Sequence, residues 1–271
     1  MKKILVIINN YHLPQPVLDC ALHIAKREKA SLFGLFIKNL KLSDSESYLF
    51  PSDINLTDTD FTTETDEQES LHLEDAQLKV FKDACAAEGV PSYTHRIHTN
   101  YLDVLLDHSA FADLIICDAE KDPTLYSLKS LLSDAHCPIL LVQKEYQAFE
   151  TIVFTYDGKP SSMEAIRQFT YLFSEKSQLP VHLISAQPTE IDLIEYSDLL
   201  KEWLPLHYPN SSIKILKGNA KEEIPQFINQ QKNALVVMGA YGRSSLSRFF
   251  KESLANVVLE KSAASLFVAH D

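Results

Sequence analysis

The stretch Leu235–Ser244 reads Leu-Val-Val-Met-Gly-Ala-Tyr-Gly-Arg-Ser, and Ser253 follows ten residues beyond Arg243. An apolar run typical of a buried β-strand ends at Gly239, a second glycine comes three residues later, and Ser253 precedes a helical pattern. Glycines after a strand let the backbone take a positive φ or approach a ligand closely. Ser253 as an N-cap would leave helix amides and the positive end of the helix dipole facing outward. Because such amides suit an anion such as phosphate, the pattern indicates a phosphate-facing turn.

The alternative is a plain strand-to-helix connection. In that case Gly239 and Gly242 serve only the turn, and Ser253 merely caps the helix. The chain contains only six glycines, and two of them stand in this turn. This concentration favours a backbone that approaches a ligand.

At these residues the chain resembles the universal stress protein family, whose phosphate loop reads Gly, two residues, Gly, nine residues, Gly, then Ser or Thr. Gly239, Gly242 and Ser253 match in type and spacing, and Glu252 stands in place of the third glycine. A carboxylate 4 Å from a phosphate charge costs on the order of 1 kcal/mol in water and about 4 kcal/mol near a protein surface. Glu252 therefore either points away from the site or weakens binding. The resemblance implies ATP or AMP in the second half of the chain only, with magnesium accompanying ATP.

The rest of the chain is organised as a repeat. Ile4–Ile8 and Ser31–Ile37 are apolar runs on either side of a helical pattern, which is the βαβ signature, and the same order restarts at Thr151. The sequence predicts two tandem α/β domains, residues 1–145 and 150–271. Each is a doubly wound parallel sheet of five strands and about four helices, of the universal stress protein and adenine-nucleotide alpha hydrolase type. The resemblance further implies that the terminal strands, Ile139–Val142 and Leu266–Val268, pair between the domains, which would remove two exposed sheet edges.

The first copy differs from the second at the turn that carries the motif. Asp118–Pro123 reads Asp-Ala-Glu-Lys-Asp-Pro, which contains three carboxylates and no glycine. Carboxylates in that place would repel an anion. Asn9 stands where the second copy has Asp157. The first half is therefore predicted to be a degenerate copy without a nucleotide site.

In a doubly wound sheet, ligands bind at the carboxyl ends of the strands. The resemblance gives Asp157 a role near the adenine and ribose, whereas the residues alone equally allow a turn aspartate ahead of Lys159 and Pro160. Arg243 and Ser244 are candidates for charge-assisted contacts to phosphate, with a solvated arginine as the alternative. The predicted binding residues are Tyr156, Asp157, Ala186, Met238, Gly239, Gly242, Arg243, Ser244, Ser253 and Leu254.

Composition excludes several other functions. The formal net charge of −12 and the pI near 5.3 argue against nucleic acid or an anionic membrane as a partner. Residues 41–70 hold nine acidic residues and one lysine and are predicted to form an acidic loop. No apolar run reaches the roughly 18 residues of a membrane span. The four cysteines form no C-x-x-C pair, which favours free thiols in the cytoplasm.

One helix is predicted over residues 191–204, with Leu199 and Trp203 on its apolar face. Trp203 is the only tryptophan of the chain. Because it shares that face, we expect it in the core rather than as a platform for a nucleotide base.

No Walker P-loop, nucleophile elbow, metalloprotease motif or Rossmann fingerprint is present. The leading hypothesis is therefore a cytoplasmic, non-enzymatic stress-response module that binds an adenine nucleotide or another small anion. Slow ATP hydrolysis is a second hypothesis, for which Asp157 and Glu252 are the only candidate metal-binding carboxylates. An interaction scaffold without a small ligand, acting through the acidic loop or the degenerate half, is a third. The sequence leaves the formation of a homodimer open.

Overall fold

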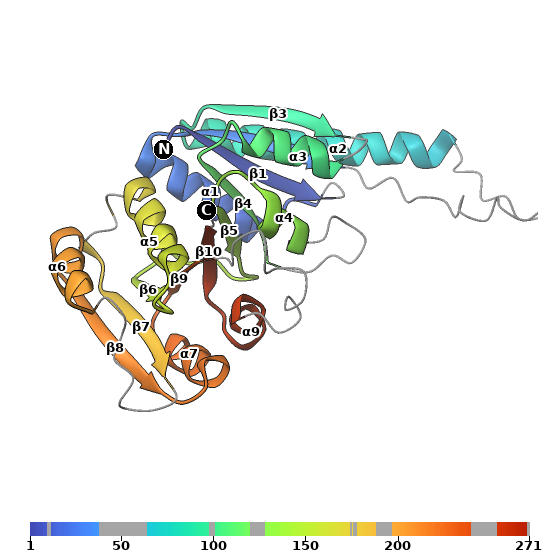
Figure 1. Ribbon diagram of the computed structural model, residues 1–271. Coiled ribbons are helices and arrows are strands. Elements are labelled where there is room, and N and C mark those ends of the chain that lie inside the picture. Colours follow the sequence, from blue (N-terminus) through green and yellow to red (C-terminus); the bar gives the residue numbers. More distant parts are fainter. Residues whose placement is uncertain are drawn as a thin grey trace, which may run out of the picture.

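The computed structural model describes residues 1–9, 12–37, 64–97, 101–119, 128–173, 175, 178–187, 197–239 and 254–269 (Figure 1). The first half of the chain contains β1 (Lys3–Asn9), α1 (Gln15–Glu28), β2 (Ser31–Ile37), α2 (Glu64–Ala87), β3 (Ser92–Ile97), α3 (Tyr101–Ser109), β4 (Leu114–Asp118), α4 (Leu128–Asp134) and β5 (Ile139–Val142). The second half contains β6 (Thr151–Thr155), α5 (Pro160–Leu172), β7 (Val181–Gln187), α6 (Ser197–His207), β8 (Ser211–Lys217), α7 (Ala220–Asn229), β9 (Ala234–Gly239), α9 (Leu254–Lys261) and β10 (Ser265–Ala269).

All ten strands belong to one sheet, in the order β3-β2-β1-β4-β5-β10-β9-β6-β7-β8. Neighbouring strands are parallel within each half. The two halves meet where β5 runs antiparallel to β10, with Leu141 opposite Leu266 and Ile139 opposite Val268. This is the pairing of terminal strands that the sequence predicts. The mixed α/β fold with doubly wound parallel sheets is confirmed.

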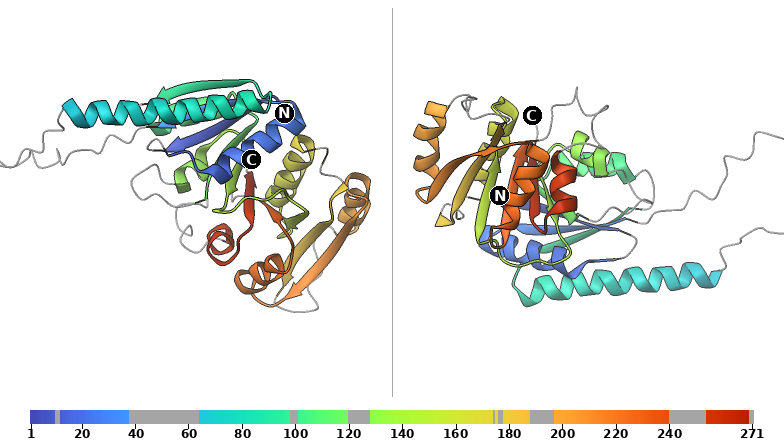
Figure 2. Two further views of the ribbon diagram at one scale, coloured as in Figure 1. Left: turned by 180° about the vertical axis from the view of Figure 1, so that it is seen from behind. Right: turned by 90° about the horizontal axis from the view of Figure 1, so that it is seen from below.

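The central strands are apolar because helices cover both faces of the sheet, whereas the edge strands β3 and β8 carry polar, partly exposed residues. In β1, no residue of Ile4–Ile8 is more than 2% exposed. Ile4, Val6 and Ile8 pack on the face covered by α1, α2, α5 and α6, whereas Leu5 and Ile7 pack on the face covered by α3, α4, α7 and α9. The period of two along the strand thus divides the core into two layers, and Figure 2 shows the two groups of helices from behind and from below.

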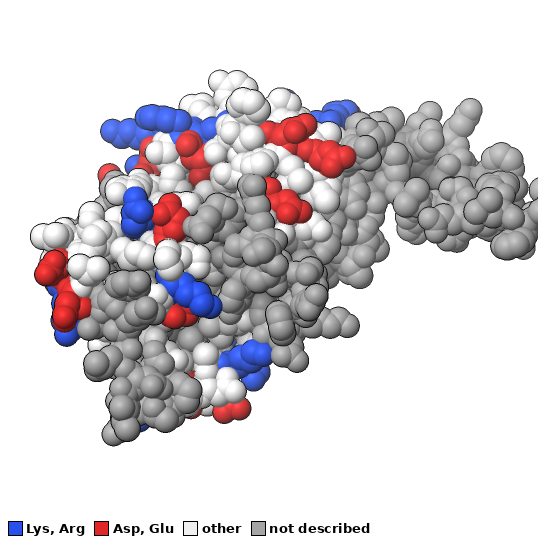
Figure 3. Space-filling model, viewed as in Figure 1, with Lys and Arg blue, Asp and Glu red and all other residues white. Residues whose placement is uncertain are grey.

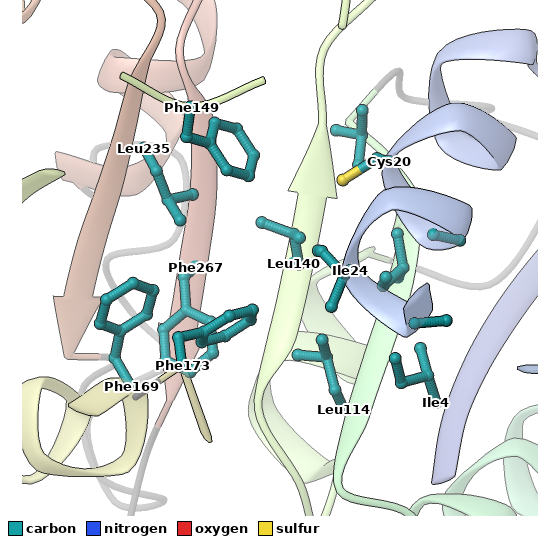
Figure 4. Packing of buried hydrophobic residues seen from close by; sticks show 14 of the residues in the cluster. Ile4, Cys20, Ile24, Leu114, Leu140, Phe149, Phe169, Phe173, Leu235 and Phe267 are labelled. Atoms are coloured by element: carbon teal, nitrogen blue, oxygen red, sulfur yellow. The ribbon is translucent and has the colours of Figure 1, made fainter. Parts of the chain in front are cut away.

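The core continues across the junction between the halves. Figure 4 shows Ile24 and Leu140 from the first half close to Phe267 from the second. The ring of Phe267 contacts Phe169 and Phe173, with centroid separations of 5.3 and 5.9 Å. These three rings belong to the second half, and Leu140 of β5 lies opposite Phe267 of β10 in the same buried cluster, so the core is continuous across the junction.

The segment that follows β5 is tied to the second half. The side-chain amide of Gln143 donates to the carbonyl oxygen of Leu259 at 3.2 Å. Close to β6, the side-chain amide of Asn233 donates to the carboxylate of Glu150 at 2.7 Å. Both ends of the connection are therefore fixed against the structure around β9 and α9.

Two predictions of local structure need correction. Residues 41–70 were expected to form one acidic loop, but α2 already begins at Glu64, and residues 41–63 lie outside the described residues. Acidic residues favour the start of a helix, because their charge is stabilised by the helix dipole, so an acidic run alone does not indicate a loop. The predicted helix over residues 191–204 is observed as Ser197–His207, and residues 191–196 are not described.

Basic and acidic side chains are mixed on the face shown in Figure 3, where blue and red residues lie next to each other. Lys26–Glu88 and Lys201–Asp198 are exposed ion pairs on the surface of the described chain. Single exposed pairs add little stability. Among the helices that the structure describes, none has the length and the apolar composition that would let it cross a membrane.

Candidate functional site

A cavity of about 250 Å³ lies at the carboxyl ends of β6, β7 and β9. This is the place where the order of the strands reverses, since β6 has β9 on one side and β7 on the other. Ligands of doubly wound proteins bind in this place. The cavity is lined by Thr155, Tyr156, Asp157, Ser161, Ser162, Ala186, Asn219, Ala220, Lys221, Ile224, Met238, Gly239 and Leu254.

The structure brings together six of the ten residues that the sequence proposes for binding. These six are Tyr156, Asp157, Ala186, Met238, Gly239 and Leu254. The remaining four, Gly242, Arg243, Ser244 and Ser253, lie outside the described residues, as does Glu252. The strand ends that were expected to face a ligand thus share one cavity.

Gly239 has a packing role that the sequence does not reveal. A Cβ atom at this position would lie 2.7 Å from the carbonyl oxygen of Ser161 and 2.8 Å from the Cα atom of Ser162. Both of these are backbone atoms in the first turn of α5. The glycine therefore allows α5 to begin directly against the end of β9, which places the start of that helix at the cavity.

Asp157 takes part in a turn and also lines the cavity. Its Oδ1 atom accepts a hydrogen bond from the backbone N–H of Lys159 at 3.1 Å, and its Oδ2 atom lies 3.2 Å from the Lys159 Nζ atom. Gly158, between them, has a φ of +85°, which glycine adopts readily. The carboxylate is 47% exposed. The two roles that the sequence leaves open for Asp157 are therefore compatible.

Two helices begin at the cavity. In α5, the N-cap residue Lys159 makes no side-chain capping bond, and the Ser162 hydroxyl donates to the Lys159 carbonyl at 2.8 Å. In α7, the side chain of Asn219 accepts from the backbone N–H of Lys221 at 2.9 Å. The positive ends of both helix dipoles thus lie near the cavity, and half-buried Lys221 adds a full positive charge. This electrostatic arrangement favours an anion.

Several lining residues were not found from the sequence. Ser161 and Ser162 belong to the start of α5, and Asn219, Ala220, Lys221 and Ile224 belong to the start of α7. The sequence-based prediction of the site covered residues after the strand ends and one helix start, at Ser253 and Leu254, but not the starts of α5 and α7. The N-cap pattern at Asn219 would have pointed to a further helix start.

In the ranges that the structure describes, no group of three or more His, Cys, Asp or Glu side chains is placed to hold a metal ion. Asp118 ends β4 in the first half, but residues 120–127, which include most of the predicted degenerate turn, lie outside the described residues.

A doubly wound parallel sheet with a cavity at its point of strand reversal is an α/β fold whose ligands bind at that point. Residues 197–270 match the model of the universal stress protein family. The universal stress protein Slr1230 of Synechocystis sp. is 24% identical over 196 residues, which cover 69% of this chain and 68% of that protein.

Solved structures share the fold over the full length. A universal stress protein from Archaeoglobus fulgidus superposes with a TM-score of 0.71 at 13% identity, covering 99% of this chain and 96% of that one. A functionally unknown protein from Pseudomonas aeruginosa gives a TM-score of 0.63 at 19% identity, covering 100% and 92%. The family match over residues 197–270 and these similarities support the resemblance to the universal stress protein family that the motif around Gly239 indicates.

Proposed function

We propose that the second half of the chain binds an adenine nucleotide in the cavity at the ends of β6, β7 and β9. The observation that carries this proposal is the convergence of Asp157, Ala186, Met238 and Lys221 on one concave site beside two helix N-termini. A site of this kind combines apolar surface for a base with a few polar groups that fix its orientation.

The volume of the cavity suggests that it holds only the nucleoside part of a nucleotide. A volume of about 250 Å³ is close to the lower limit of ordinary small-molecule sites, which suits a nucleoside better than a whole nucleoside triphosphate. Ala186, Met238 and Ile224 supply apolar contacts for the base, and the Asp157 carboxylate can accept hydrogen bonds from ribose hydroxyls. The phosphates would then extend toward Lys221 and toward the motif residues after Gly239, with magnesium accompanying ATP.

We further propose that the chain consists of two domains, residues 1–145 and 150–271, of which only the second binds nucleotide. The family model matches residues 197–270, and on that basis we propose a stress-response role. We also propose that the protein is cytoplasmic and non-enzymatic. None of the four cysteines forms a disulfide and all four are buried, which suits a reducing compartment. Burial raises the pKa of the Cys137 thiol to about 12, which makes that thiol unreactive.

Isothermal titration calorimetry with ATP, AMP, adenosine and GTP tests the proposal. We expect the three adenine compounds to bind at a single site per chain and GTP to bind at least tenfold more weakly. Asp157→Asn should weaken all three, because it removes the carboxylate while keeping an oxygen that can accept from the Lys159 amide. Lys159→Met is the matched control, since it breaks the same ion pair and leaves the carboxylate in place. Absence of heat and of thermal stabilisation at millimolar ATP would refute nucleotide binding and favour an interaction scaffold.

Hydrolysis is a separate question from binding. Because the described residues offer no cluster of metal ligands, we expect no phosphate release from ATP and magnesium over several hours. Release that is lost in Asp157→Asn would instead favour the slow hydrolase.

A further inference from the structure

A second and larger cavity lies next to the proposed nucleotide cavity, in the groove between α5 and α6. Its volume is about 650 Å³. Both helices pack on the same face of the sheet (Figure 1). Tyr156 lines both cavities, so the two are neighbours. The groove is lined by Tyr156, Lys159, Pro160, Met163, Glu164, Arg167, Leu199, Leu200, Glu202, Trp203 and Leu206.

Helix α6 carries more apolar surface than its packing requires. Leu200 and Leu204 are buried against the core, as one face of an amphipathic helix should be. Leu199 and Leu206, however, are 60% and 81% exposed. The sequence placed Leu199 on the buried face together with Trp203, and this was wrong for Leu199. Trp203 is only partly buried and lines the groove. The groove therefore has an apolar wall that the described residues leave exposed.

The charged side chains around the groove largely compensate one another. Arg167 pairs with Glu164 at 3.0 Å, and Lys159 pairs with Asp157 at 3.2 Å. The lining as a whole contains two cationic and two anionic side chains. A charged ligand would be attracted by some of these side chains and repelled by others, which would not offset the free-energy cost of removing its charge from water. The groove therefore suits an uncharged ligand.

The length of the groove limits what can occupy it. From Leu199 to Leu206, α6 advances about 10 Å, which is two helical turns. A stable protein partner needs roughly 600 Å² or more of contact surface on each side, which two turns of one helix do not provide. The volume, in contrast, lies within the ordinary range of small-molecule sites.

We propose that the groove between α5 and α6 binds an uncharged apolar small molecule with an aromatic or branched aliphatic body. The site is distinct from the nucleotide cavity, and it stands whether or not a nucleotide binds there. Leu199, Met163 and Leu206 would supply the apolar contacts, and the indole of Trp203 would contact the ligand directly.

Trp203 allows a direct test, because it is the only tryptophan in the chain. N-phenyl-1-naphthylamine is an uncharged aromatic probe that accepts energy from an excited indole. We expect saturable quenching of Trp203 emission with sensitised emission from the probe, at one probe per chain. Leu199→Lys should weaken probe binding at least about fivefold, and Leu206→Lys should do the same. The matched control is Leu73→Lys on α2, since Leu73 is also 60% exposed and should leave the affinity unchanged.

Four results would overturn the proposal. The first is the absence of energy transfer up to the solubility limit of the probe. The second is equal affinities of Leu199→Lys and Leu73→Lys for the probe. The third is displacement of the probe by ATP or adenosine, which would place it in the nucleotide cavity. The fourth is a dimer in sedimentation velocity that Leu199→Lys dissociates, which would make the groove an interface between two copies of the chain.

Discussion

Replacing Gly239 by alanine tests how the start of α5 is positioned at the cavity. The new Cβ atom would lie 2.7 Å from the carbonyl oxygen of Ser161 and 2.8 Å from the Cα atom of Ser162, distances that real Cβ atoms essentially never show. Because both neighbours are backbone atoms, a change of rotamer cannot relieve the contact. Helix α5 must move, although Ile166 and Phe169 hold it in the core.

The expected cost follows from these contacts. Forcing an extra methyl group into a packed site costs about 1–3 kcal/mol. Alanine also lowers the conformational entropy of the unfolded chain relative to glycine. This effect stabilises the folded state by up to about 1 kcal/mol where the native backbone conformation suits alanine. We expect Gly239→Ala to lower the free energy of unfolding by about 1–2 kcal/mol, which urea denaturation at an unchanged m-value would measure. It should also weaken nucleotide binding, since the helix start moves away from the cavity.

Gly89→Ala is the control for the Gly239→Ala variant. Gly89 has a φ of +67°, and no atom lies within 4 Å of the place that a Cβ atom would take, so alanine there costs stability only through backbone strain. It should destabilise the chain by about 1–2 kcal/mol and leave nucleotide affinity unchanged. A Gly239→Ala protein as stable as the wild type would refute the close packing of α5 on β9.

Three further predictions concern other parts of the chain. Phe267→Ala at the junction of the halves should cost about 3–5 kcal/mol, whereas Phe111→Ala, at a residue that is 79% exposed, should change stability by less than about 0.5 kcal/mol; both are measured by urea denaturation. Burial and the nearby His95 lower the pKa of His108 in the folded state. The free energy of unfolding should therefore decrease as the pH falls from the usual histidine pKa to this lower pKa, because the unfolded state binds the proton first. His108→Gln should flatten this part of the pH profile, as measured by urea denaturation. Lys221→Met should weaken ATP about tenfold in calorimetry and leave adenosine nearly unchanged; equal losses for both would contradict a role of Lys221 at the phosphates.

The strands were predictable from the sequence because their burial leaves a simple signal. Ile139–Val142 was predicted with the observed bounds, and Leu266–Val268 lies within β10. A parallel strand covered on both faces must be apolar throughout, and the chain then needs polar or glycine residues to turn. The order of strands and helices and the repeat followed from this pattern.

Features that depend on tertiary packing were harder to predict. The apolar pattern around Phe111 predicts the buried face of a helix, yet α3 ends at Ser109 and Phe111 is exposed. Periodicity also did not show that Leu199 faces a groove, because the width of the buried face is set by the neighbouring helix. In the same way, Gly239 is a glycine because α5 packs against it, and no local pattern reveals which element will lie there.

The starts of helices account for most of what was missed in the site. Lys221 and Ser161 are distant from the motif in sequence and reach the cavity only because α7 and α5 begin beside β6 and β9. The six described residues of the predicted site lie together because the carboxyl ends of parallel strands meet at one edge of the sheet. The role of the motif residues after Gly239 stays a proposal.

A crystal structure of the protein grown with ATP and magnesium tests the nucleotide cavity most directly. We predict an adenine ring against Ala186 and Met238, with the ribose next to Asp157 and nothing bound at the corresponding strand ends of the first half. Nucleotide bound in the first half instead, or a cavity between β6 and β9 that stays empty at millimolar ATP, would contradict the proposed site.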